Sequence, residues 1–161
     1  MKINLINKCA AVMLITLSSV MISSAELYAV GAKVEAFKAK DQHDADYEFK
    51  PSSIKYLLVS HDMETGKKAN AVLTTLGKDY FSDHKAAYLA NIEGMPRIGR
   101  MFAIPKMQKY AHRIILGDDA GLMAKFPMQA GKVTVIAISG GKVQSISYWS
   151  PGESKLDDFL K

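Results

Sequence analysis

Cysteine is almost absent from this sequence, which has a single one, Cys9, among 161 residues. A lone cysteine cannot close an intramolecular disulfide, and the chain after it has no thiolate to act as nucleophile, redox group or metal ligand. Gly94, Gly99, Gly117 and Gly121 do not have the Gly-x-Gly-x-x-Gly spacing of a dinucleotide-binding turn. Neither thiol chemistry nor that mode of flavin or nicotinamide binding is therefore predicted.

A strong excess of one charge is also lacking. The chain has 21 lysines and arginines against 16 aspartates and glutamates, a formal net charge of +5. Lys2 and Lys8 are the charged residues of positions 1–25, so the remainder has 19 basic against 16 acidic residues, or +3. Such a near balance is not typical of nucleic-acid-binding domains, and nucleic acid is not a predicted partner.

The first 25 residues have the pattern of a secretory signal peptide. A basic, polar start precedes an uncharged apolar run at 9–22, and residues 23–25 (Ser-Ser-Ala) suit a signal peptidase. The run is shorter than the ~20 residues that span a bilayer, so cleavage after Ala25 is favoured over retention as an anchor. Cys9 follows Lys8 instead of small apolar residues, which argues against lipidation. We expect a periplasmic or secreted protein without stable membrane insertion.

Apolar runs and turn residues divide residues 26–161, the size of one domain, into alternating strands and helices. Two short strands around a polar turn come first. Buried strands are predicted at 54–60, 86–92 and 113–117. The last two strands, 133–139 and 143–149, are rich in β-branched and aromatic residues, and a Gly-Gly-Lys turn joins them, which predicts a β-hairpin.

Helical spacing follows these buried strands. A first helix, capped by Asp62 or Thr65, ends at Gly77. A second, after Pro96, is bent or ended by Pro105. Its predicted apolar side consists of Ile98, Met101, Phe102 and Ile104. A short helix follows the aspartates at 118 and 119, and the last nine residues, ESKLDDFLK, predict a final amphipathic helix. This alternating order implies a largely parallel sheet with an antiparallel edge and helices on both faces.

Two segments carry a resemblance to a known superfamily. VGAKVEAFKAKDQ (30–42) resembles the start of peroxiredoxins and periplasmic thioredoxin-like reductases, and residues 113–149 are similar to their strand, aspartate, short helix and terminal hairpin. The resemblance implies a thioredoxin-like fold of the α/β class. That fold has three layers, α/β/α, with a mixed central sheet, an N-terminal β-hairpin and a C-terminal helix.

The sequence departs from this superfamily where its chemistry would lie. The resemblance places redox cysteines between the strand at 54–60 and the first helix, but residues 60–66 read Ser-His-Asp-Met-Glu-Thr-Gly. No thiol oxidoreductase or peroxiredoxin activity is therefore expected, and no catalytic residue is assigned. Gly131 and Lys132 occupy the place of the cis-proline, and a trans peptide is expected there because a non-proline cis bond costs ~3 kcal/mol.

The candidate ligand or partner site combines that loop with the turn before residue 133, and consists of His61, Asp62, Glu64, Thr65, Gly131 and Lys132. Ser60, His61 and Asp62 are the residue types of a hydrolytic triad. Adjacent residues seldom point at one another, so helix capping in a solvated loop is favoured. An enzyme with thiol-free chemistry at residues 60–66 stays open as an alternative.

No metal site and no cofactor is predicted, although a metal- or haem-handling protein stays open. The polar turn with His43, Asp44 and Asp46, with residues 83–84 as further donors, offers nitrogen and oxygen ligands without the spacing of a known zinc motif. Three methionines that recur every six residues could bind cuprous ion, but this spacing does not align them on one helix face, and core packing is favoured. They are Met95, Met101 and Met107.

Four basic residues near the second helix form a candidate surface for an acidic partner or anionic lipid headgroups, with a solvated helix face as the favoured alternative. They are Arg97, Arg100, Lys106 and Lys109. Tyr148 and Trp149 would mark an interaction surface if exposed. The sequence thus favours a redox-inactive binding or adaptor protein whose partner is an unknown protein or small ligand in the periplasm.

Overall fold

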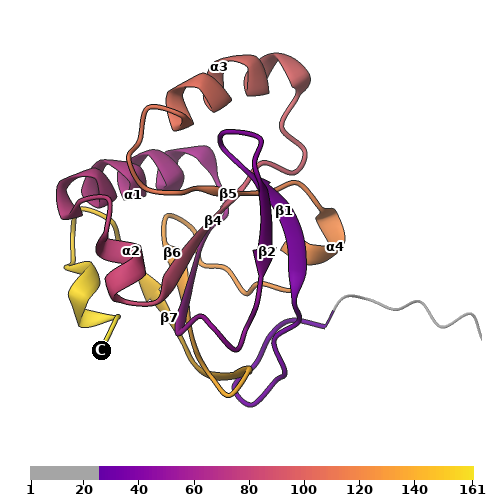
Figure 1. Cartoon of the computed structure of the whole chain (residues 1–161), viewed down its shortest axis with the longest axis vertical. Helices are drawn as coiled ribbons and strands as arrows, with labels where there is room; N and C mark the ends of the chain where they lie inside the picture. Colours follow the sequence, from indigo (N-terminus) through magenta and orange to yellow (C-terminus); the bar gives the residue numbers. More distant parts are fainter. Residues whose placement is uncertain (1–25) are drawn as a thin grey trace, which may run out of the picture.

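The computed structural model describes residues 26–161 and places seven strands in one sheet (Figure 1). The predicted signal peptide, residues 1–25, lies outside the described residues. Across the sheet the order is β2-β1-β5-β4-β3-β6-β7. The strands are β1 Phe37–Asp41, β2 Asp46–Phe49, β3 Tyr56–Ser60, β4 Ala86–Asn91, β5 Ile115–Gly117, β6 Val133–Ser139 and β7 Lys142–Trp149.

The mixed character of the sheet is confirmed, whereas the expectation that it is largely parallel is wrong. Parallel pairing is confined to β3 with β4 and β4 with β5. Antiparallel pairing joins β1 to β2, in the N-terminal hairpin, and to β5. It also joins β6 to β3 and to β7. Helical crossovers join β3 to β4 and β4 to β5, as parallel neighbours require, whereas β1–β2 and β6–β7 are hairpins.

Helices lie on both faces of the sheet, as predicted for a three-layer arrangement. They are α1 Met63–Leu76, α2 Tyr80–Asp83, α3 Arg97–Met107 and α4 Ala120–Met123. Figure 1 shows α1 and α2 on one side of the sheet, α4 on the other, and α3 beyond the upper end of the sheet. No helix among residues 26–161 combines the length and apolar character needed to cross a membrane.

Strand alternation divides the core into two clusters. Tyr56 and Leu58 of β3 pack with Ala69 and Leu73 of α1 in one cluster. Leu57 and Val59 point the other way and pack in the second cluster with Met123 and Phe126, in and after α4, and with Tyr28 and Val34 of the segment before β1. Because both faces of β3 are covered, its five residues are all buried, as the continuous apolar run predicted.

Local signals set both ends of α1. Asp62 is its N-cap, because the Asp62 carboxylate accepts a hydrogen bond from the Thr65 backbone N–H at 2.8 Å. Of the two predicted caps, Asp62 and Thr65, the structure has the first. Gly77 is the C-cap and has a φ of 93°, a conformation that L side chains rarely adopt. The helix therefore begins and ends where short-range chemistry predicts.

Two expectations about helices are wrong, and one of two alternatives is excluded. Of the bend or end expected at Pro105, the end is excluded, because α3 continues to Met107. The last nine residues form only a 3₁₀ turn at Leu156–Asp158 instead of an amphipathic helix. Leu156 and Leu160 are both buried in the core, and tertiary packing decides the shape of so short a segment. The third difference concerns the apolar side of α3.

The large apolar side chains of α3 are mostly exposed. Ile98, Met101 and Phe102 were expected to face the core, yet each is about two thirds exposed, and no residue of α3 is buried. Helical spacing predicts an apolar stripe but not the direction in which that stripe faces. The side of α3 that faces the protein instead carries Gly99, Ala103 and Met107.

Candidate functional site

A cavity of about 250 Å³ lies between α1 and α3, over the carboxyl ends of the parallel strands β3 and β4. Ligands of open α/β sheets bind at these strand ends. A cavity of about 150 Å³ holds benzene, so this one has room for about ten non-hydrogen atoms. Its walls are mainly apolar and contain Met63, Met95, Phe102, Ala103, Met107 and Tyr110.

Two buried polar side chains contribute to the lining, Ser60 from the end of β3 and Asn70 from α1. Tyr88 donates its hydroxyl hydrogen to Ser60 Oγ at 2.9 Å, so the Ser60 hydroxyl keeps its own hydrogen to donate. Burial raises the pKa of Tyr88 well above its usual value, so this donor stays protonated. The Ser60 hydroxyl is therefore oriented by the hydrogen bond from Tyr88.

Asn70 is held in place by a buried histidine. Its Oδ1 lies 2.9 Å from His112 Nε2, which must carry the proton for this hydrogen bond. None of the described residues accepts a hydrogen bond from Asn70 Nδ2. Burial lowers the pKa of His112 to about 4, so the ring is neutral at neutral pH. The Asn70 side chain is thus held through Oδ1 by His112, and its Nδ2 is the hydrogen-bond donor that it offers to the cavity.

Charged side chains lie among the lining residues near the helix surfaces. Lys67 pairs with Glu64 at 2.8 Å, and Lys106 is exposed and forms no ion pair with any described residue. Partial burial of Asp62 favours its protonated form, but hydrogen bonds from the Thr65 backbone and hydroxyl outweigh it and lower the pKa of the carboxyl. The Asp62 carboxylate therefore accepts its hydrogen bonds from the first turn of its own helix.

The expected loop site does not form one pocket. Asp62 lines the α1/α3 cavity, whereas His61 lines a separate cavity of about 500 Å³ beside α4. His61 Nε2 lies 3.0 Å from Thr134 Oγ1, and that hydroxyl donates to the Pro127 carbonyl at 2.6 Å. Burial lowers the pKa of His61. With His61 bonded to Thr134, Asp62 to Thr65 and Ser60 to Tyr88, the three residues do not make a triad.

The other expected site residues lie elsewhere. Glu64 is exposed and pairs with Lys67, and Thr65 is buried beneath the cap. Gly131, with a φ of 71°, and Lys132 form the turn before β6, where Lys132 N donates to Gln129 O at 3.1 Å. Neither Gly131 nor Lys132 lines the two cavities described above.

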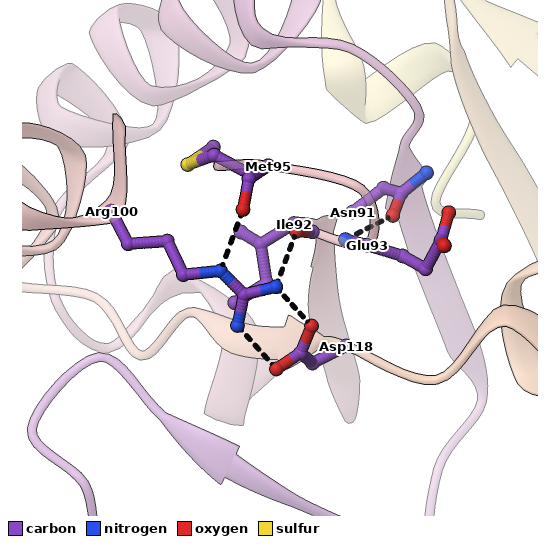
Figure 2. Close-up of polar contacts among 6 residues, drawn as sticks. All are labelled: Asn91, Ile92, Glu93, Met95, Arg100 and Asp118. Carbon is purple, nitrogen blue, oxygen red and sulfur yellow. Dashed lines mark hydrogen bonds and ion pairs between the residues drawn. The ribbon is translucent and has the colours of Figure 1, made fainter. Parts of the chain in front are cut away.

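Arg100 corrects the expected basic surface, because it turns toward the protein and not outward (Figure 2). Its guanidinium donates to the carbonyls of Met95 at 3.0 Å and Ile92 at 3.2 Å, and forms a two-armed ion pair with Asp118. These bonds tie α3 to the ends of β4 and β5. The remaining residues of the predicted surface, Arg97, Lys106 and Lys109, are exposed.

Possible metal ligands are not clustered in the described part of the chain. No group of three or more His, Cys, Asp and Glu side chains there could hold a metal ion. Asp46 pairs with Lys40 at 2.9 Å, and the turn at His43 is closed by Asp41. Met95 and Met107 line the α1/α3 cavity, but Met101 is about two thirds exposed, so its expected core packing is wrong. Trp149 is fully buried.

Asn70 and His112 are the site residues that sequence reasoning missed. An asparagine on the apolar stripe of α1, between the buried Ala69 and Leu73, was the signal that could have found the first. Nothing in the sequence around His112 pairs it with Asn70, which lies 42 positions earlier in the chain.

Comparison with known proteins gives fold neighbours only. No family model and no curated protein matches the sequence. The thioredoxin domain of a thiol-disulfide oxidoreductase from Bacteroides vulgatus is 13% identical, with a TM-score of 0.53 over 83% of this chain and 99% of that one. The peroxidoxin BcpB of Mycobacterium tuberculosis is 14% identical, with a TM-score of 0.54 over 83% and 94%. A peroxiredoxin-like protein from Aquifex aeolicus is 11% identical, with a TM-score of 0.53 over 85% and 86%.

These likenesses confirm the thioredoxin-like fold. The single cysteine, Cys9, precedes the described residues, and the sequence from residue 10 onward has none. The loop before α1, for which the resemblance implied redox cysteines, leads into the helix with Asp62 and Met63. The chain is thus a thioredoxin-fold protein that lacks the redox cysteines.

Proposed function

We propose that this protein is an exported binding protein, which holds a small, mainly apolar molecule with a hydrogen-bond acceptor in the α1/α3 cavity. The observation that carries the proposal is the pairing of apolar walls with the oriented donors of Ser60 and Asn70. Small-molecule sites have this composition: mostly apolar, with a few placed polar groups that fix orientation.

The charge around the cavity favours an anionic acceptor over a neutral one. Lys106 is an uncompensated cation among the lining residues, and the Asp62 carboxylate is already satisfied by Thr65. The site therefore suits a carboxylate with an apolar body of about ten non-hydrogen atoms. Binding without turnover is favoured because no histidine lines the cavity to activate Ser60 as a nucleophile.

Export is supported by the apolar run at 9–22 and the small residues before Glu26. N-terminal sequencing of the protein recovered from the periplasm of cells expressing the full chain tests this part. A chain beginning at Glu26 is expected, and a chain that retains its first residues in the membrane fraction would contradict export with cleavage.

Ligand binding is tested by NMR titration of the chain from Glu26 with octanoate and with 3-phenylpropionate. A ligand of about ten non-hydrogen atoms that gains ~0.4 kcal/mol per atom binds with a Kd of about 1 mM, within reach of such a titration. Shifts are expected at Asn70 and along the facing sides of α1 and α3. Propylbenzene, which lacks the carboxylate, should bind more weakly.

Cavity filling provides the matched control. Ala103→Trp places a large side chain in the cavity, whereas Ala71→Trp adds the same side chain to the exposed surface of α1. The first should abolish the shifts and the second should leave them unchanged. Equal binding by both variants, or shifts that map to another region, would refute this site.

A further inference from the structure

The outer face of α3 is an exposed apolar surface of which only Phe102 also lines the α1/α3 cavity. Ile98, Met101 and Phe102 are 68%, 67% and 67% exposed, although helices of globular proteins normally bury such residues. Ile98 and Met101 do not line the cavity. Figure 1 shows α3 beyond the upper end of the sheet, so this face is presented on a protruding helix.

The orientation of α3 is fixed from its inner side. Gly99, Ala103 and Met107 line the cavity, and Arg100 bonds to two backbone carbonyls and to Asp118. Turning the large apolar residues inward would break these bonds. The exposure of the outer face is therefore a consequence of how the helix is held.

The outer face has the layout of a helix that lies in a membrane interface. At 3.6 residues per turn, Met101, Pro105, Ile98 and Phe102 fall within an arc of about 100°. Arg97 lies at one border of this arc and Lys106 at the other, and both are exposed. Lys109 is exposed just beyond the end of the helix, and α3 contains no acidic residue.

A lipid surface suits this face better than a protein partner. A stable protein interface buries about 800 Å² on each partner, which a single 11-residue helix with three large apolar side chains does not offer. A convex apolar strip bordered by cations can instead enter the boundary between headgroups and acyl chains while its cations meet lipid phosphates. The free charges on the outer side of α3 are all positive, which complements an anionic bilayer.

We infer that α3 attaches this protein to anionic lipid bilayers through Ile98, Met101 and Phe102, with Arg97, Lys106 and Lys109 on the lipid phosphates. The attachment is peripheral and reversible. Phe102 and Lys106 also line the cavity, whereas Ile98, Met101, Arg97 and Lys109 do not, so the variants of this face below change only the latter four residues.

The test is flotation of the chain from Glu26, which contains both core clusters, with vesicles of phosphatidylcholine containing phosphatidylglycerol and with phosphatidylcholine alone. Starting at Glu26 removes the apolar run at 9–22, which would itself bind lipid. Binding is expected to the anionic vesicles and to weaken with added salt. Equal binding to both vesicle types, or no binding to either, would overturn the inference.

Paired variants separate the apolar and the charged contributions. Ile98→Ser with Met101→Ser should lower partitioning by about tenfold or more, since each side chain loses its transfer from water. The control pair Val30→Ser with Met128→Ser removes equally exposed apolar residues elsewhere and should leave partitioning unchanged. If both pairs lower it alike, the membrane contact is not made by α3.

The charged pair is Arg97→Gln with Lys109→Gln, which should lower partitioning by about fivefold for each charge. Lys68→Gln with Lys78→Gln removes two exposed lysines elsewhere and serves as the control. Size-exclusion chromatography of the same proteins identifies the competing occupant. The alternative outcome is a parent protein that binds no vesicles and forms a dimer that the Ile98→Ser and Met101→Ser double variant dissociates. That result would assign the face to a second copy of the chain and refute membrane attachment.

A direct readout uses the absence of cysteine after residue 9. Met101→Cys, labelled with an environment-sensitive fluorophore, should show a blue shift and gain of intensity with anionic vesicles. Val30→Cys, labelled in the same way, should not. A response at residue 30 that equals the response at residue 101 would contradict insertion by α3.

Discussion

Stability below neutral pH should depend on His112. This histidine is 2% exposed, it lies against the rings of Phe81, Tyr88 and Tyr110, and its Nδ1 has no partner among the described residues. Protonation would create a buried N–H donor without an acceptor and a buried charge without a counter-ion. The histidine should therefore resist protonation as long as the protein stays folded.

The magnitude follows from the difference between two pKa values. Burial lowers the pKa of His112 to about 4 in the folded protein, against about 6.5 for an unfolded histidine. The unfolded chain binds the proton first, so the free energy of unfolding falls as the pH decreases from about 6.5 to about 4. Linkage gives a loss of about 2 kcal/mol at pH 5 and about 3 kcal/mol at pH 4. A domain with a typical stability of 5–15 kcal/mol should show this loss clearly.

Urea unfolding at a series of pH values measures the effect, with the fluorescence of the single, buried Trp149 as the probe. His112→Gln removes the titrating group. Other titrating groups, including His61 and the carboxylates, remain in both proteins, so the difference between the two stability curves isolates His112. That difference should change by about 2 kcal/mol between pH 7.5 and pH 5.

The replacement of His112 can change stability by a constant amount at all pH values, because Asn70 loses its partner, and this offset does not affect the test. His43→Gln, on an exposed turn, is the control and should run parallel to the parent protein. Parallel curves for His112→Gln and the parent would refute the reasoning. An NMR titration that places the His112 ring near pKa 6.5 would refute it as well.

Three further predictions concern individual hydrogen bonds. Asp62→Ala removes the N-cap bond to Thr65 and should lower the free energy of unfolding by about 1 kcal/mol, measured by urea titration; an unchanged midpoint would contradict capping. Gln42→Leu leaves the buried His112 carbonyl and the buried Ile114 N–H without their partner, so the free energy of unfolding should fall by about 2–4 kcal/mol in the same assay. A smaller loss than that of Asp62→Ala would count against this prediction. Arg100→Ala removes the bonds to two carbonyls and to Asp118, so hydrogen exchange should accelerate in α3 and not in α1, whereas uniform acceleration would argue against a local anchor.

Short-range patterns in the sequence were sufficient for most of the elements. The apolar runs at β3 and β4, the glycine turn between β6 and β7, and the choice of Asp62 or Thr65 as the cap all depend on residues close in the chain. Their chemistry acts locally, so the sequence predicts them. The Gly77 stop of α1 belongs with them, because only the local backbone conformation requires it.

The candidate site could not be predicted in the same way. Three of its lining residues come from separate parts of the chain: Ser60 from β3, Asn70 from α1 and Tyr110 from the segment after α3. They meet only when α1 and that segment pack over the strand ends. Asp62 of the predicted loop lines the α1/α3 cavity, but the sequence grouped His61 with Asp62. In the structure neighbouring residues at the end of β3 line different cavities, because successive side chains of an extended segment alternate in direction.

The sequence by itself determined that thiol chemistry is absent after Cys9, that strands and helices alternate, and that α1 ends at Gly77. These features need only composition, spacing and nearest neighbours along the chain. Tertiary structure alone decided that the apolar stripe of α3 faces outward, because Arg100 reaches carbonyls at Ile92 and Met95. The direction of a helix face is set by what the rest of the chain places beside it, and periodicity carries no information about that.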